Sequence, residues 1–172
     1  LVVSPGVAVS TRQIDAARRR GVPVVGDIEL FAQHAAAPVV AITGSNGKST
    51  VTTLLTMMAE RAGLNAAAGG NIGLPVLDML DVSRELYVLE LSSFQLETLA
   101  SLRPQAVALL NISADHMDRY PSLQAYIDAK ARIFQGTSLA VINREDANVL
   151  GALPAGLPSR GFSFGNPSGS DY

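Results

Sequence analysis

From Pro38 onward, short apolar runs alternate with stretches whose apolar residues recur at helical spacing. The runs that predict strands are Val39–Thr43, Leu86–Leu91, Ala106–Ile112 and Leu139–Asn143. The stretches that predict helices are Ser49–Ala62, Pro75–Leu80, Phe94–Ser101 and Ser122–Phe134. Because the strands are apolar throughout, they are typical of a parallel sheet that is covered on both faces. We therefore predict an α/β fold with a mostly parallel sheet flanked by helices.

The first 37 residues carry their own set of strand and helix signals. These fall at Leu1–Val3, Thr11–Arg20, Pro23–Val25 and from Asp27 onward. They contain too few apolar residues to enclose a separate core. We therefore expect residues 1–37 to be the C-terminal part of a smaller α/β domain, and residues 38–172 to be a truncated central domain. Since the chain begins with Leu1, we expect a fragment of a longer protein.

Composition excludes several classes of protein. Hydrophobic residues make up 48% of the 172 residues, which is enough for a sizeable core. The net charge of −2 argues against a general nucleic-acid binder, and we interpret the basic run Arg18–Arg20 as a solvated helix end. Without cysteine, the chain forms neither disulfides nor thiolate metal sites. No apolar run approaches the ~20 residues of a membrane span. No charged-then-apolar leader is present, so we expect a cytoplasmic protein.

The most informative segment is the loop at residues 44–50, Gly-Ser-Asn-Gly-Lys-Ser-Thr, between a predicted strand and a predicted helix. Such a loop forms a cradle for phosphate, because backbone N–H groups and the helix dipole favour an anion there. Lys48 can contact the distal phosphates, and Ser49 or Thr50 can place a hydroxyl on Mg²⁺. The usual P-loop pattern has a glycine where this chain has Ile42, so the match is incomplete. An ordinary strand-to-helix turn is the alternative.

Polar side chains also follow two other predicted strands. Ligands of open α/β sheets bind at the carboxyl ends of the strands, so we expect these side chains to meet the P-loop in one crevice. Glu90 lies where a P-loop enzyme places its metal-linked carboxylate. His116 can bind a metal or transfer a proton. A surface ion pair for Glu90 and a structural loop role for His116 are the alternatives, and Asp115 and Asp118 suit turns or caps.

Two weaker signals complete the set of candidates. Gly69–Gly73 is a second glycine-rich loop, which permits close approach to a ligand or simply makes a turn. Lys130 lies at the centre of an apolar helical stripe formed by Leu123, Ile127, Lys130 and Phe134. A lysine there either extends to solvent along the apolar surface or points into the crevice.

Taken together, four segments resemble the Mur ligases of peptidoglycan synthesis: Thr43–Thr50, Gly69–Pro75, Leu89–Glu97 and Asp115–Pro121. The resemblance extends from about Ser4 to Asn143, and the shorter Gly-x-x-Gly-Lys-Ser-Thr loop is a mark of the family. The stretch Ser-Ser-Phe-Gln-Leu-Glu favours the family member that adds D-glutamate to UDP-N-acetylmuramoyl-L-alanine. The resemblance implies a P-loop NTPase-like central domain after a UDP-sugar-binding domain. It also implies a C-terminal amino-acid-binding domain, which we expect this chain to lack.

The resemblance further implies roles for individual residues. In this family ATP activates a carboxylate as an acyl phosphate, which the amine of the amino acid then attacks. ATP would be bound by Gly44, Ser45, Asn46, Gly47, Lys48, Ser49 and Thr50. The catalytic residues would be Lys48, His116 and Lys130. Two Mg²⁺ ions would be held by Ser49, Glu90, His116 and a carbamylated Lys130. The UDP-sugar substrate would be faced by Ser4, Pro5, Gly6 and Asn71.

Other functions remain open at this point. A folylpolyglutamate-type ligase has a similar loop but fits the other segments less well. A GTPase is disfavoured, because the chain contains no Asn-Lys-x-Asp string for guanine recognition. A nucleotide-binding module without turnover is the non-enzymatic alternative, since we expect this fragment alone to be inactive. We expect a monomer that binds neither nucleic acid nor membranes.

Overall fold

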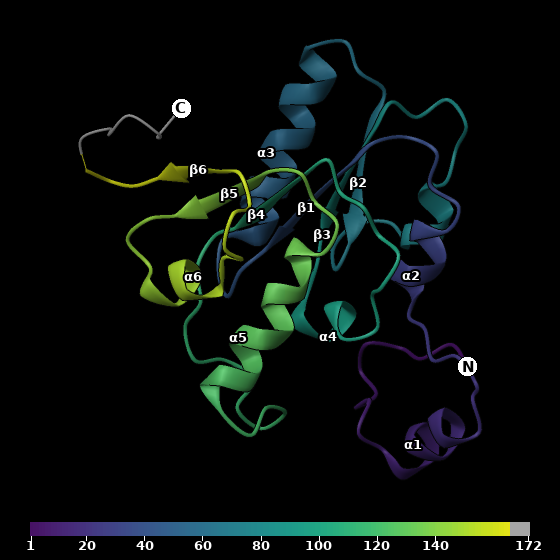
Figure 1. Ribbon diagram of the computed structural model, residues 1–172. Helices are drawn as coiled ribbons and strands as arrows, with labels where there is room; N and C mark the ends of the chain where they lie inside the picture. Colours follow the sequence, from purple (N-terminus) through teal and green to yellow (C-terminus); the bar gives the residue numbers. More distant parts are fainter. Residues whose placement is uncertain (166–172) are drawn as a thin grey trace.

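The chain folds around a six-stranded parallel sheet. The computed structural model describes residues 1–165. The strands lie in the order β2-β3-β1-β4-β5-β6, and every neighbouring pair is parallel (Figure 1). Their bounds are β1 Val39–Thr43, β2 Ala66–Gly70, β3 Leu86–Glu90, β4 Ala106–Leu109, β5 Ala140–Asn143 and β6 Ser159–Phe162. The predicted α/β fold with a mostly parallel sheet is confirmed.

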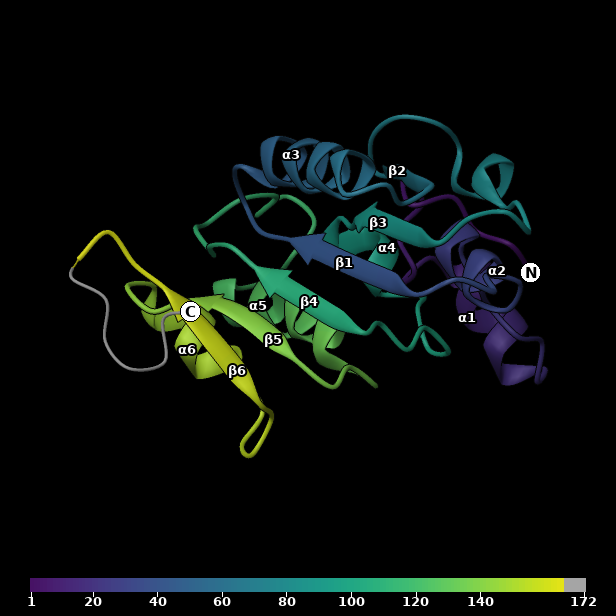
Figure 2. The same cartoon turned by 90° about the horizontal axis from the view of Figure 1, so that it is seen from above.

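Helices lie on both faces of this sheet. They are α1 Arg12–Arg19, α2 Asp27–Ala32, α3 Lys48–Arg61, α4 Ser93–Leu96, α5 Leu123–Ala131 and α6 Ala147–Ala152, with short 3-10 turns η1 Val76–Met79 and η2 Arg132–Phe134. Helix α3 lies on one face, and α4, α5 and α6 lie on the other (Figure 2). Right-handed crossovers explain this division, since the chain moves to one side of β1 to reach β2 and to the other side to reach β4, β5 and β6.

The central strands are buried on both faces, so alternate side chains enter two different cores. Ala41 and Leu89 face the larger core, which includes residues of α4 and α5. Their neighbours Ile42 and Val88 face a smaller core beneath α3. This arrangement explains why the strand segments read as continuous apolar runs.

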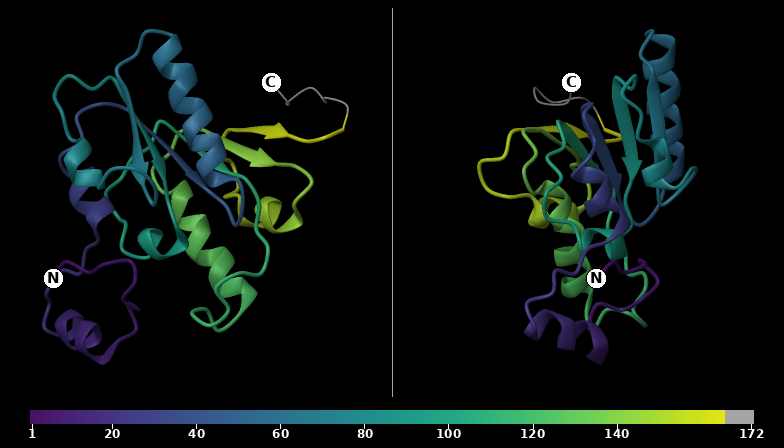
Figure 3. Two further views of the ribbon diagram at one scale, coloured as in Figure 1. Left: turned by 180° about the vertical axis from the view of Figure 1, so that it is seen from behind. Right: turned by 90° about the vertical axis from the view of Figure 1, so that its right-hand side faces the viewer.

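The N-terminal residues divide between two locations. Helix α2 belongs to the main core, because Ile28 and Phe31 are fully buried. The ring centroids of Phe31 and Tyr87 lie 4.9 Å apart in a T-shaped arrangement. The segment that contains α1 projects from the rest of the molecule (Figures 1 and 3), and a parallel bridge between Val2 and Val25 closes it. The domain boundary between residues 37 and 38 stays a prediction.

Several predicted elements are wrong in extent or type. Gly69 and Gly70, which were expected in a loop, end strand β2. The expected helix from Phe94 ends at Leu96, and the expected strand from Ala106 ends at Leu109. The strand signals at Leu1–Val3 and Pro23–Val25 give an isolated bridge, and Pro75–Leu80 gives a 3-10 turn.

Three elements were absent from the expectation: β2, α6 and β6. Strand β2 has the sequence Ala-Ala-Ala-Gly-Gly, whose residue types are depleted in strands. It forms because parallel pairing with β3 satisfies its backbone. None of the helices in the described residues combines the length and apolar character that a membrane crossing requires.

Candidate functional site

The P-loop segment, residues 44–50, connects the end of β1 to the start of α3. Gly47 has a φ of 81°, a left-handed conformation that suits glycine, and α3 begins at the next residue. The first N–H groups of this 14-residue helix therefore face the loop, where the helix dipole favours an anion. The Lys48 Nζ donates to the carbonyl oxygen of Ser45 at 3.1 Å. Ser49 and Thr50 are exposed in the first helical turn.

Side-chain hydrogen bonds hold the P-loop against the loop that follows β4. The Ser45 hydroxyl lies 3.2 Å from the Tyr126 hydroxyl and accepts the N–H of Ser113 at 3.0 Å. Asn111 accepts the N–H of Asn46 at 2.8 Å and donates to the Asn46 carbonyl at 3.0 Å. The loop is therefore fixed in place by two neighbouring elements, as preorganised phosphate recognition requires.

Glu90 is a buried carboxylate with one free oxygen. Its side chain is 1% exposed at the end of β3, and Oε1 accepts the Asn71 Nδ2 at 2.8 Å. Among the described residues, Oε2 has no hydrogen-bond partner. Gly70 pairs with Glu90 in register, and a side chain on Gly70 would collide with the Glu90 carbonyl. Since an unpaired buried charge is costly, Oε2 suits a bound cation.

Lys130 is buried beside the P-loop. Its side chain is 1% exposed, and Nζ donates to the Gly44 carbonyl at 2.8 Å and lies 4.7 Å from the centroid of the Tyr126 ring. Burial, assisted by the positive charge of Lys48, lowers the pKa of Lys130 to about 7, while Asp115 opposes this shift. This lowered pKa favours the neutral amine over the ammonium compared with an exposed lysine.

These side chains meet in a pocket of about 210 Å³, lined by Lys48, Asn71, Ser92, Ser93, Phe94, Asp115, His116, Tyr126 and Lys130. His116 has a φ of 54°, in the left-handed region, which is uncommon for a residue with a side chain. Its ring lies 4.9 Å from that of Phe94, and its Nε2 lies 3.5 Å from the carboxylate of Asp115. The pocket thus combines cations, a carboxylate and an imidazole.

The structure brings only part of the predicted site together. Lys48, Asn71, His116 and Lys130 line one pocket, and Glu90 is tied to it through Asn71. Ser4, Pro5 and Gly6 do not line the pocket. Arg119 connects this segment to the elements around the pocket, because it donates to the carbonyls of Pro5 and Gly6 at 3.5 and 3.4 Å.

The described residues do not form a metal site from carboxylates and histidines alone. Within residues 1–165, no three His, Asp or Glu side chains gather closely enough to hold an ion. Mg²⁺ usually takes one or two protein carboxylates and completes its shell with water and substrate phosphates. The single buried Glu90 beside a phosphate loop fits that kind of site.

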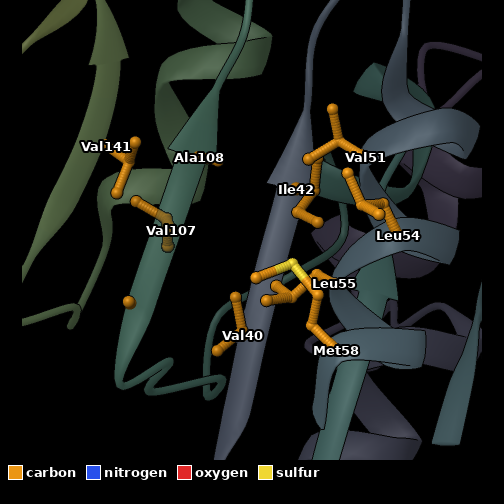
Figure 4. A pocket seen from close by; sticks show the side chains of 10 residues that line it. Val40, Ile42, Val51, Leu54, Leu55, Met58, Val107, Ala108 and Val141 are labelled. Atoms are coloured by element: carbon orange, nitrogen blue, oxygen red, sulfur yellow. The ribbon is translucent and has the colours of Figure 1, made fainter. Parts of the chain in front are cut away.

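A second hollow, of about 240 Å³, lies between α3 and strands β1, β4 and β5 (Figure 4). Among the described residues its lining is apolar: Val40, Ile42, Val51, Leu54, Leu55, Met58, Ala106, Val107, Ala108 and Val141. Without a polar side chain it offers neither an acid, a base nor an anion-binding group. Of these two hollows, the pocket beside the P-loop is the candidate for chemistry.

Sequence reasoning missed three residues that shape the site. Tyr126 and Phe94 line the pocket, and Arg119 connects it to the N-terminal segment. The position of Tyr126, one helical turn before Lys130, was a usable signal because such residues share a helix face. No sequence signal identified the main-chain carbonyls that Arg119 binds, which lie more than a hundred positions away.

Solved structures share this fold. The chain resembles UDP-N-acetylmuramoyl-L-alanyl-D-glutamate–2,6-diaminopimelate ligase with a TM-score of 0.70 at 21% identity, covering 99% of this chain and 46% of that one. It also resembles the MurF ligase of Thermotoga maritima, solved in complex with ADP, with a TM-score of 0.63 at 18% identity, covering 94% of this chain and 47% of that one. At these identities the likeness shows the fold.

Closer relatives exist among curated proteins. The chain is 57% identical over 173 aligned residues to the UDP-N-acetylmuramoylalanine–D-glutamate ligase of Nitrosococcus oceani, and 52% identical over 172 residues to that of Methylococcus capsulatus. Each match covers 100% of this chain and 38% of the relative, so the chain spans well under half the length of these proteins. A sequence profile of the Mur ligase middle domain matches residues 42–170, which is most of the chain. The chain therefore belongs to the Mur ligase family.

Proposed function

We propose that the protein containing this chain is an ATP-dependent ligase of peptidoglycan synthesis, which joins D-glutamate to UDP-N-acetylmuramoyl-L-alanine through an acyl phosphate. The relatives named for this ligation are more than half identical to the chain over its full length. One structural observation carries the proposal. A preorganised phosphate loop, a buried carboxylate with a free oxygen and a buried lysine adjoin a single pocket.

In this proposal the P-loop binds the phosphates of ATP. The backbone N–H groups of residues 44–50 and the Lys48 ammonium offset phosphate charge, which is the main demand of phosphoryl transfer. Glu90 and Ser49 would hold one Mg²⁺, and His116 and Lys130 would hold a second. Bound Mg²⁺ would supply neutralisation of the charge that develops on the transferring group.

Lys130 would act as a carbamate. The ammonium would first lose one proton; the neutral amine nitrogen would then attack the carbon of CO₂ and lose a second proton. After both losses the cation would have become an anion. The pKa of about 7 favours this step, because the ordinary lysine pKa leaves almost no neutral amine near neutral pH. An anion at this position attracts a metal ion, whereas an ammonium repels it. Carbon NMR of the full-length protein with labelled bicarbonate tests this assignment, and a bare amine in the active enzyme contradicts it.

The remaining candidates would contact the acceptor substrate. Asn71 would face UDP-N-acetylmuramoyl-L-alanine while it fixes one oxygen of Glu90. Residues Ser4–Gly6 would contribute to the UDP-sugar site, and residues 1–37 would belong to that domain. We further infer that the D-glutamate site is supplied by parts of the protein outside this chain. Because the reaction consumes ATP, we place the protein in the cytoplasm, and we propose that it acts as a monomer.

The test is substrate-dependent ADP release by the full-length protein. We expect release with ATP, Mg²⁺, UDP-N-acetylmuramoyl-L-alanine and D-glutamate together, and a product of the mass of the D-glutamyl adduct. Release only with a folate and L-glutamate points to a folylpolyglutamate-type ligase. Nucleotide binding without release under either condition points to a binding module.

A further inference from the structure

Arg119 joins two segments that lie far apart in the sequence. It lies on the loop between β4 and α5, and its guanidinium contacts three consecutive main-chain carbonyls near the N-terminus. Nη2 donates to Val7 at 3.0 Å and to Pro5 at 3.5 Å, and Nη1 donates to Gly6 at 3.4 Å. Arginine suits this task, because its planar fork presents several donors in fixed directions.

Arg119 is itself held in place from the side of α4. Its guanidinium carbon lies 4.4 Å from the centroid of the Phe94 ring, and Nη2 lies 3.7 Å from Oε2 of Glu97. The two charged side chains are 17% and 15% exposed, so solvent screens their attraction only in part. Since Glu97 Oε2 is buried without a hydrogen-bond partner in the described residues, the guanidinium compensates its charge.

The residues that contact Arg119 also reach the pocket beside the P-loop, which is the proposed nucleotide pocket. The Phe94 ring under Arg119 lines the pocket and lies 4.9 Å from the His116 ring. The backbone also connects the two, because the N–H of Arg119 donates to the His116 carbonyl at 2.9 Å. A shift of the Pro5–Val7 carbonyls therefore reaches His116 through one side chain and one tight turn.

We propose that Arg119 is a positioning residue, which holds residues 4–7 against the nucleotide pocket and so fixes how the UDP-sugar substrate meets the site. The inference rests on the proposed function and assigns a role to a residue outside the predicted site. Arg119 acts through the main chain of the segment, so its effect is independent of the side chains at positions 5–7.

Steady-state kinetics of the full-length enzyme test the role. We expect Arg119→Ala to raise the KM for UDP-N-acetylmuramoyl-L-alanine about tenfold and to leave kcat and the KM for ATP within about twofold. Arg119→Lys keeps the positive charge over Phe94 but loses the forked guanidinium. Its KM for UDP-N-acetylmuramoyl-L-alanine should therefore fall between those of the wild type and Arg119→Ala. Arg103→Ala is the matched control, because Arg103 also donates to main-chain carbonyls, those of Ala100 and Leu102, away from the pocket.

Hydrogen exchange of the same variants separates the positioning role of Arg119 from the proposed function of the enzyme. We expect faster exchange in residues 4–9 for Arg119→Ala and no change there for Arg103→Ala. Unchanged exchange overturns the inference, and so does faster exchange with an unchanged KM, which would show a purely structural tie. If the wild-type enzyme fails to turn over these substrates, the proposed function fails, and the exchange result still decides whether Arg119 holds the segment.

Discussion

Two hollows in this structure have similar size and opposite chemistry. The pocket beside the P-loop measures about 210 Å³ and includes Lys48, Asp115, His116 and Lys130. The hollow beside α3 measures about 240 Å³ and has only apolar walls. Size therefore does not distinguish the two hollows. The position of polar side chains distinguishes them, because polar groups gather where parallel strands end and helices begin.

The two hollows also differ in whether ionisable side chains are buried near them, which is unfavourable for folding. Beneath the middle of α3, Ile42 and Val88 are fully buried and stabilise the sheet without ionisable groups. At the carboxyl ends of the strands, the chain buries Glu90 and Lys130, each 1% exposed. Burying ionisable groups opposes folding unless they find partners, and such groups are typical of functional sites.

The sharpest way to test this contrast is to remove the phosphate-facing charge. Lys48→Ala should lower ADP release by the full-length enzyme about 10²–10³-fold, because one preorganised donor in such a site is worth roughly 3–4 kcal/mol. Arg61→Ala removes an exposed cation at the other end of α3 and should leave turnover unchanged. Turnover of Lys48→Ala within threefold of wild type would remove this residue from the phosphate site.

A second test replaces the free carboxylate oxygen. Glu90→Gln should raise the Mg²⁺ concentration for half-maximal activity about tenfold, as loss of a ligand charge predicts, and His116→Ala should shift it the same way. Glu29→Gln is the control, because Glu29 is buried with both oxygens hydrogen-bonded, to the Ala100 and Ser101 N–H groups and to Gln33. An unshifted magnesium midpoint in Glu90→Gln, with native circular dichroism, would count against the metal role.

The pH dependence of stability should expose the buried lysine. Between pH 7 and the ordinary value of 10.5, the unfolded chain binds more protons at Lys130 than the folded chain does, because the folded pKa is lowered to about 7. The stability of the wild type should therefore rise with pH in this window relative to Lys130→Met. We expect the Tm difference to change by on the order of 10 °C between pH 7 and 10. A pH-independent difference would place the lysine pKa near its ordinary value.

The smallest effect should come from the apolar hollow beside α3. Met58 is 59% exposed at the edge of the apolar hollow, so Met58→Ala should change the free energy of unfolding by no more than about 0.5 kcal/mol. Kinetic constants for all substrates should stay at wild-type values. A tenfold loss of activity in this variant would mean that both hollows serve the reaction, and the contrast between them would disappear.

The features predicted best from the sequence are those that depend on the local pattern of apolar and polar residues. The strand Val39–Thr43 was predicted with its observed bounds, because its apolar run is flanked by Pro38 and by the glycine loop. The apolar stripe of α5 singled out Lys130 and left two alternatives, of which the structure shows the buried one. In both cases the residues that determine the outcome are close in the sequence and also close in the folded structure.

The rest depends on contacts that are distant in the sequence. Strand β2 exists through its pairing with β3, and its own alanines and glycines give no strand signal. The link between Asn71 and Glu90 requires the same pairing. The carbonyls that Arg119 binds belong to a segment without regular structure. The assigned roles of Ser49, Glu90, His116 and the other site residues stay predictions.

Gly70 has a consequence for how essential positions are recognised. It carries no functional group, yet any side chain there would displace the strand end that carries Glu90, and its φ of 102° disfavours every other residue. In a saturation-mutagenesis survey, Gly70 should thus tolerate as few replacements as a residue that touches substrate. Intolerance at this position would report the shape of the backbone and not a chemical role, so a list of essential positions is broader than a list of reacting groups.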